Sequence, residues 1–259
     1  LETLKALLLF GPADARAPLP LAQSAAAMIE RRMAQLSPAA LTLLRALALA
    51  PELLTLPLAA RLAGRAPEAT AADWAELEQL QLARGAQPAH DLVREQVLAA
   101  WPQAARAAQA HALAQALQAQ DVEPARMAAL WLQAQAFTAA AASFEQAAAA
   151  AGRAGRLAEQ VDLFERAADA WRRAHDAPQA FAAELQAWNV TLVLRGSRVV
   201  LEGSEPLLAR AGSGPARAQV LTLRANAFLN EARYAQALAE SVAALGCAAP
   251  GSATAREAA

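Results

Sequence analysis

The chain has 259 residues, with 23 Lys and Arg against 24 Asp and Glu, so its formal net charge is −1. That length suits one large domain or two ordinary ones. The near-neutral balance excludes a global basic field that would draw the chain to nucleic acid or to an anionic membrane. The single cysteine, Cys247, excludes an internal disulfide and any metal site built from several cysteines,. We therefore expect a protein of the cytoplasm.

Alanine, leucine, glutamine and arginine dominate, and β-branched residues are sparse outside residues 190–200. Helix propensity is therefore high nearly everywhere, and the composition predicts a mostly α fold. The longest uncharged apolar stretch, residues 127–144, is rich in alanine and interrupted by Gln133 and Gln135. This stretch is too weakly apolar for a membrane span, so we expect no contact with a membrane.

The first part of the chain is expected to form a winged-helix-like domain over residues 21–103. "SPAALTLL" begins one of its helices, with Ser37 as the N-cap and Pro38 at the first helical position,. The short segment "GAQPAH" supplies a turn and an extended stretch before a last helix,. The predicted helices that precede it cover residues 22–36, 38–50, 55–63 and 68–83.

From residue 104 to residue 259 the pattern becomes repetitive, and "RANAFLNEARYAQALAESVAAL" (224–245) resembles a tetratricopeptide repeat of about 34 residues,. Small residues let two antiparallel helices approach, and aromatic side chains fill the remaining gaps. A weaker copy runs through Trp171, Asp176, Ala180 and Ala187. The pattern predicts an α-solenoid of tetratricopeptide-like helical hairpins, truncated at the C-terminus; a generic alanine-rich helical bundle stays open as the alternative. The expected packing residues are Ala128, Trp131, Phe137, Ala140, Phe144 and Ala147 in one copy and Ala225, Phe228, Ala232, Tyr234, Ala237 and Ala244 in another.

Motifs for catalysis are missing. Lys5 is the only lysine and lies in "TLKAL", so the chain cannot hold a phosphate-binding loop that ends in Gly-Lys-Ser/Thr,. No Gly-x-Ser-x-Gly elbow occurs,. The three histidines, His90, His111 and His175, do not have the spacing of metal ligands,. We expect no catalytic residue, no metal site and no cofactor bound by this chain alone.

The helix expected before the extended segment is acidic. It carries Glu68, Asp73, Glu76 and Glu78 and has no positive residue before Arg84. These carboxylates would repel DNA phosphates, so we expect no direct contact with nucleic acid. They are expected on a solvated outer face, with the apolar side chains of Trp74, Leu77 and Leu80 or Leu82 turned to the core.

Several segments together resemble one family, the bacterial signal-transduction ATPases with numerous domains (STAND), which include LuxR-type activators and cyclase-linked ATPases. The segments are "LETLKALL" (1–8), "MIERRMAQLSPAALTLLRALAL" (28–49), "DWAELEQLQLARG" (73–85) and "AHDLVREQVLAAWP" (89–102). The resemblance implies that residues 1–20 are the end of an ATPase lid and a linker, and that an ATPase domain lies upstream. ATP or ADP is then expected only with that domain, and a protein or inducer ligand is expected on the repeats.

"AHDLVRE" is similar to the Met-His-Asp motif of the wider class, with Ala89 in place of the methionine. The resemblance gives His90 the role of a donor to the β-phosphate of bound ADP, with Asp91 beside it at the start of the helix. The helix dipole would add partial positive charge there. The other interpretation stays open, in which Asp91 caps the helix and His90 satisfies a buried backbone group.

These features lead us to expect a non-catalytic regulatory and protein-interaction segment of a larger ATP-dependent signal-transduction or transcriptional regulator. It would couple nucleotide state to the binding of a partner or inducer. Two alternatives stay open: a transcription factor whose own winged helix reads DNA, and a plain helical-repeat scaffold.

Overall fold

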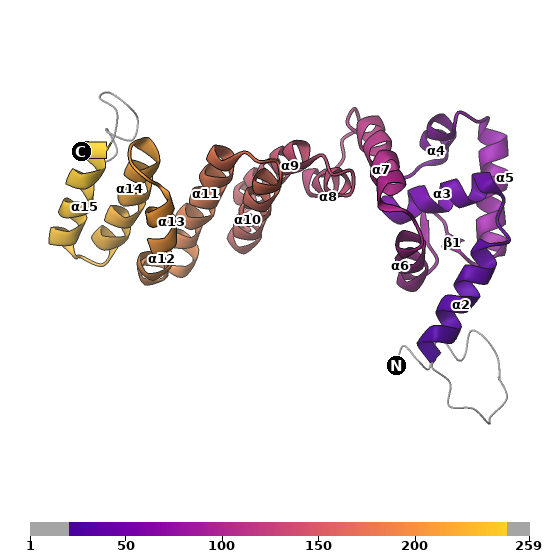
Figure 1. Cartoon of the computed structure of the whole chain (residues 1–259), viewed down its shortest axis with the longest axis horizontal. Coiled ribbons are helices and arrows are strands. Elements are labelled where there is room, and N and C mark those ends of the chain that lie inside the picture. The colour runs from indigo at the N-terminus through magenta and orange to yellow at the C-terminus, as the bar shows by residue number, and fades with distance from the viewer. Residues whose placement is uncertain (1–20, 248–259) are drawn as a thin grey trace. The chain divides into compact units, whose positions relative to one another are not determined.

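A computed structural model describes residues 21–247, and side chains from residue 25 onward. Within these residues the chain is mostly helical, with fourteen helices and one sheet of two strands (Figure 1). The predicted end of an ATPase lid and linker, residues 1–20, lies outside the described range. The contacts divide the chain near Val122, and each of the two units has its own core. No helix in the described range is both long and apolar enough to cross a membrane.

The first unit consists of six helices and the two-stranded sheet. The predicted start at Ser37 is confirmed: its hydroxyl accepts a hydrogen bond from the backbone N–H of Ala40 at 3.1 Å, and Pro38 is the first helical residue. Leu44, Leu47 and Leu77 are completely buried and form part of the core. The elements are α2 (Leu21–Met33), α3 (Pro38–Leu49), α4 (Leu56–Ala63), α5 (Pro67–Gln79), β1 (Ala83–Arg84), β2 (Gln87–Pro88), α6 (Asp91–Ala99) and α7 (Gln103–Leu117).

The helix predicted over residues 68–83 ends early, at Gln79. Gln81 adopts a left-handed conformation with φ of 55°, and the N–H of Leu82 donates to the carbonyl of Leu77 at 2.9 Å. This closes the helix and sends Leu82 back into the core, where it is completely buried. The chain then forms the β1–β2 hairpin, in which Ala83 pairs with Pro88.

Helix α7 belongs to the first unit, although the sequence places the start of the repeats at residue 104. The side-chain amide of Gln109 donates to the carbonyl of Thr42, and the guanidinium of Arg61 donates to the carbonyl of Ala116, each at 3.3 Å. The break between the units therefore falls after α7.

The second unit is a succession of helices in which neighbours in sequence pack on one another (Figure 1). Its core includes the completely buried side chains of Val200 and Val220. Gly203 lies directly under the ring of Trp188, so that a Cβ atom at this position would overlap the ring. The helices are α8 (Pro124–Gln133), α9 (Phe137–Arg153), α10 (Leu157–Arg173), α11 (Ala177–Arg195), α12 (Ser197–Gly203), α13 (Glu205–Arg210), α14 (Pro215–Asn230) and α15 (Tyr234–Cys247).

Four turns of this unit share one geometry. Each has a left-handed residue just after a helix, and the next N–H donates to the carbonyl five residues earlier, which is the Schellman arrangement. The next helix begins at the second residue after each left-handed residue. The left-handed residues are Gln135, Gly155, His175 and Ala232, with φ between 57° and 71°. The closing bonds join Ala136 to Trp131, Arg156 to Ala151, Asp176 to Trp171 and Arg233 to Phe228, at 2.9–3.0 Å.

The first three of these turns are evenly spaced. Gln135, Gly155 and His175 follow one another at intervals of 20 residues. Two helices and their turns therefore occupy 40 residues. The resemblance to the tetratricopeptide repeat predicts a repeat of about 34 residues. The helices α9 to α11 have 17 to 19 residues, and this length accounts for the longer interval.

Candidate functional site

His90 lies at the start of α6 and caps that helix itself. Its backbone is extended, with φ of −156° and ψ of 153°, and the ring Nδ1 accepts a hydrogen bond from the N–H of Leu92 at 3.2 Å. The expected cap, Asp91, is instead the first helical residue, and the side chains of both residues are exposed. The prediction that Asp91 caps the helix is therefore wrong, and the backbone group that His90 satisfies here is the N–H of Leu92.

The acidic helix α5 uses its carboxylates within the first unit. Both oxygens of Glu76 accept hydrogen bonds from Ser37, at 2.7 Å from its backbone N–H and 2.8 Å from its hydroxyl. Asp73 is buried and forms an ion pair with Arg65 at 3.3 Å. Glu78 accepts from the N–H of Gly85 at 3.2 Å. The prediction of a solvated face is therefore wrong for Asp73 and Glu76. The guanidinium of Arg65 binds Asp73, and the backbone N–H and hydroxyl of Ser37 bind Glu76.

A groove of about 380 Å³ opens beside this ion pair, between α3, α4, α5 and α7. Its lining is mainly alanine and leucine, and Gln109 and Thr70 add polar groups. The hydroxyl of Thr70 already donates to the carbonyl of Ala66, and the charge of Arg65 is balanced by Asp73. The groove therefore offers a ligand apolar contacts and no unbalanced charge.

Most of the predicted packing residues of the second unit lie in its core. Phe137 is half-buried, with the guanidinium of Arg173 4.1 Å from the centre of its ring. The buried residues are Ala128, Trp131, Ala140, Phe144, Ala147, Ala225, Phe228, Ala237 and Ala244. Ala232 is an exposed turn residue.

Tyr234 departs from this pattern, since its side chain is 67% exposed. It lies at the start of α15, whereas Ala237 and Ala244 of the same helix are buried. The prediction that Tyr234 packs inside the array is therefore wrong for the described residues.

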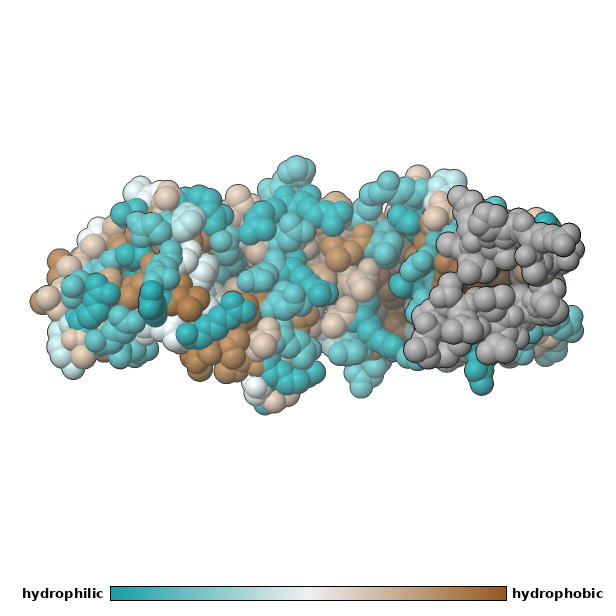
Figure 2. All heavy atoms as spheres, turned by 90° about the horizontal axis from the view of Figure 1, so that it is seen from below, coloured by the Kyte–Doolittle hydropathy of each residue, from teal (hydrophilic) through white to brown (hydrophobic). Residues whose placement is uncertain are grey.

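Helix α15 carries a continuous apolar face that the sequence analysis missed. Leu238 is 66% exposed, Val242 60% and Leu245 41%. Together with Tyr234 they line a shallow groove of about 230 Å³. Figure 2 shows pale, brown and teal residues side by side at the end of the molecule where Figure 1 places α14 and α15. The available signal was the spacing of these residues at i, i+4, i+8 and i+11, which is one helix face.

The groove of α15 contains no charged side chain. Its lining is completed by Leu229, Ala237 and Ser241. The nearest anion on α15, Glu240, turns away and accepts a hydrogen bond from Arg224 at 3.1 Å. An uncharged apolar face that is exposed to solvent can bind another apolar surface, and this lining offers no group for catalysis,.

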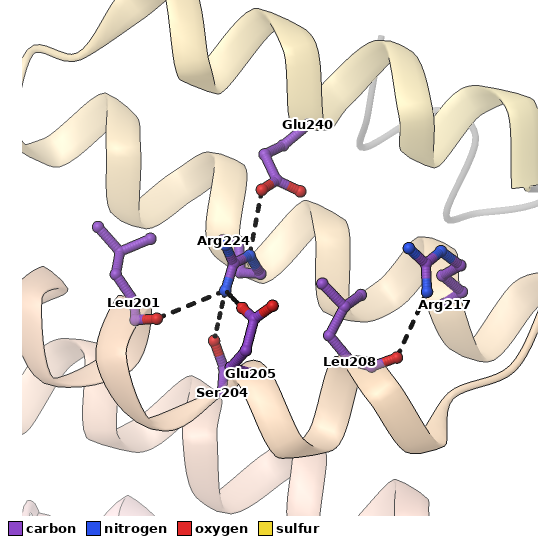
Figure 3. A network of polar contacts seen from close by, with 7 residues as sticks. All are labelled: Leu201, Ser204, Glu205, Leu208, Arg217, Arg224 and Glu240. Carbon is purple, nitrogen blue, oxygen red and sulfur yellow. Dashed lines mark hydrogen bonds and ion pairs between the residues drawn. The ribbon is translucent and has the colours of Figure 1, made fainter.

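Arg224 is the polar centre that holds α15 to the rest of the second unit (Figure 3). Its side chain is only 12% exposed, and it forms ion pairs with Glu240 of α15 and with Glu205 of α13, the latter at 2.8 Å. It also donates to the carbonyl of Leu201 and to the hydroxyl of Ser204, each at 3.4 Å. One guanidinium therefore ties three helices together.

The described residues contain no group of three or more His, Cys, Asp or Glu side chains that could hold a metal ion. The arrangement thus offers a capped helix start at His90, an apolar groove in the first unit and an apolar face on α15. No protein-family model, no curated protein and no solved structure matches this chain.

Proposed function

We propose that this chain is a non-catalytic regulatory and protein-interaction segment of a larger ATP-dependent signal-transduction or transcriptional regulator. In this proposal the first unit is a winged-helix-like domain and the second is an array of tetratricopeptide-like hairpins that receives a partner or inducer. The observation that carries the proposal is the apolar, uncharged face of α15, in a succession of helices that pack on their neighbours in sequence. Helical arrays bind by such extended surfaces.

The first unit would connect this array to the nucleotide state of an upstream ATPase domain. His90 supports this role through its place, because its exposed ring lies at the start of α6, where the helix dipole favours an anion,. A phosphate held by the upstream domain would accept a hydrogen bond from this ring. His90 would then favour the ADP-bound, closed state, and binding of a partner to the array would favour opening.

Reading of DNA by the first unit has less support. The carboxylates of Asp73 and Glu76 bind groups of their own unit, and no cation precedes Arg84 on this segment. A helix with this charge repels phosphates, so the partner of the proposal is a protein or a small inducer.

Titration calorimetry with ADP tests whether nucleotide binding belongs to the proposed upstream domain and not to this chain. We expect no saturable binding to residues 1–259, because the phosphates would be held by the upstream domain. Tight binding of ADP by this chain alone would refute the proposal.

The role of His90 is tested in the longer protein that carries the ATPase domain. His90→Ala should weaken ADP binding and raise basal activity. His90→Ser keeps an N-cap oxygen but removes the ring donor, so it controls for helix stability. Equal ADP affinity of the wild type and His90→Ser would exclude the phosphate contact, whatever His90→Ala does.

A further inference from the structure

The groove of the first unit lies within a closed set of helices. Its walls come from α3, α4, α5 and α7; α3 packs on each of the other three, and α4 packs on both α5 and α7. The groove is therefore a gap in the packing of one unit, whereas the face of α15 lies on the last described helix. The gap exists because short side chains of α3, α4 and α7 line it, namely those of Ala39, Ala46, Ala59, Ala63 and Ala112.

The groove has the size and the lining of a small-molecule site. Its volume of about 380 Å³ lies within the range of roughly 300–1,000 Å³ that such sites occupy. Leu43, Leu62 and Leu113 supply apolar walls. Thr70 and Asp73 also line the groove and lie three residues apart on α5, so they share one face of that helix,. A lining of this kind fits an apolar molecule that carries one polar group.

The two buried polar side chains of the lining can accept hydrogen bonds but cannot donate them. Thr70 is 2% exposed, and the single proton of its hydroxyl goes to the carbonyl of Ala66 at 3.1 Å,. The carboxylate of Asp73 has about four acceptor sites, and Arg65 donates to its two oxygens at 3.3 and 3.4 Å. Both side chains therefore keep acceptor capacity for a donor in the groove.

The ion pair of Arg65 and Asp73 selects against a charged ligand. The two charges balance each other across 3.3 Å, so neither an anion nor a cation gains a net attraction. A charged ligand would leave water without meeting an unpaired opposite charge, which costs free energy. An uncharged N–H or O–H group avoids this cost.

We propose that this groove binds a small, uncharged and mainly apolar molecule that donates an N–H or O–H hydrogen bond to the carboxylate of Asp73. The bound molecule contacts α7 together with α3, α4 and α5, so it stabilises the packing of the first unit,. This inference goes beyond the proposed function, which places the partner or inducer on the second unit, and it does not rest on it.

Indole and benzofuran are a matched pair of probes, because they share one shape and benzofuran has a ring oxygen in place of the N–H group. Chemical-shift titration of the 15N-labelled chain measures both affinities. We expect saturable binding of indole at millimolar concentration, with the largest shifts in α3, α4, α5 and α7. Benzofuran should bind at least about tenfold more weakly, because it cannot donate to a charged acceptor.

Asp73→Asn tests the acceptor. It keeps the shape of the side chain and replaces the carboxylate with a neutral amide, which binds a donor less strongly. The affinity for indole should fall several-fold, whereas the affinity for benzofuran should not change. Equal losses for both probes would indicate disturbed packing and would overturn the role of Asp73.

Ala112→Leu tests the place of binding. Ala112 is exposed on α7 and lines the groove, so a leucine there fills the gap without entering the core. The affinity for indole should fall at least about tenfold, the effect of losing the apolar contacts of the groove. Ala104→Leu is the matched control, since Ala104 is exposed on the same helix outside the lining. It should leave binding unchanged.

Three results would overturn the proposal: no saturable binding of indole at millimolar concentration, equal affinities for indole and benzofuran, or unchanged binding by Ala112→Leu. A large rise in indole affinity after deletion of residues 1–20 would assign the groove to that segment of the chain and overturn it as well. Each of these results leaves the proposed function intact, because the ADP titration and the His90 variants do not involve this groove.

Discussion

Replacing Arg224 should weaken the attachment of α15 to the rest of the second unit. Arg224→Met retains an unbranched apolar side chain but removes the guanidinium that pairs with Glu240 and Glu205. Glu240 is only 18% exposed, whereas Glu205 is 68% exposed. A hydrogen bond to a charged group contributes about 1.5–3 kcal/mol, while an exposed pair contributes roughly 0–1 kcal/mol. We therefore expect Arg224→Met to lower the free energy of local opening of α15 by about 2–3 kcal/mol. Most of this loss comes from the pair with Glu240.

Hydrogen–deuterium exchange of the amides of α15 measures this loss locally. At 1.36 kcal/mol for each factor of ten, exchange should accelerate roughly 30- to 150-fold in Arg224→Met. The matched control is Arg198→Ala. Arg198 pairs with Glu202 at 2.8 Å on the exposed side of α12, and the hydrogen bond and charge of Glu202 raise the pKa of its guanidinium. Its loss should leave the exchange of α15 unchanged.

A double-mutant cycle with Glu240→Gln separates this pair from the other contacts of Arg224. The two single changes should be far from additive, with a coupling of about 1.5–3 kcal/mol. Coupling below about 0.5 kcal/mol, or equal acceleration in Arg198→Ala, would refute the view that Arg224 holds α15 through Glu240.

Two further pairs of variants test the packing and the turns by urea unfolding. Gly203→Ala should destabilise the second unit by about 1–3 kcal/mol, because its Cβ would overlap the ring of Trp188,; Gly152→Ala meets only the end of a flexible glutamine and should be neutral or stabilising. Ala232→Gly should stabilise by roughly 1 kcal/mol, because Ala232 has φ of 57°,. Gly155→Ala, at the corresponding turn, should destabilise by about 1–2 kcal/mol, and a reversed sign for either turn variant would contradict the assigned geometry.

The mostly α fold and the start of α3 could be predicted because both depend on local chemistry. Alanine and leucine favour helix at nearly every position, and Ser37 followed by Pro38 forms a cap without help from distant residues,. The cap of α6 could not be predicted in the same way. Histidine is not among the preferred capping residues, and Asp91 beside it is, so the local preference indicated the wrong side chain,.

The 20-residue interval between turns could not be predicted from the sequence, for a related reason. Only one of the four left-handed turn residues is glycine; the others are Gln135, His175 and Ala232. The turns at Gln135 and Ala232 have neither glycine nor proline nearby, so they give no local signal in a sequence this rich in alanine,. Likewise, Asp73 and Glu76 resemble surface carboxylates in sequence, and only the distant donors Arg65 and Ser37 make them part of the packing.

The capping geometry of His90 limits how strongly it could report on a nucleotide. The ring Nδ1 already accepts a hydrogen bond from the N–H of Leu92, so the ring could contact a phosphate only through its other nitrogen,. The phosphate contact is therefore a single hydrogen bond, with the carboxylate of Asp91 nearby in the first turn. A hydrogen bond to a charged group contributes about 1.5–3 kcal/mol, which corresponds to roughly 10- to 150-fold in ADP affinity. A loss far above this range in His90→Ser would mean that the ring holds a larger part of the nucleotide pocket than its place at the start of α6 implies.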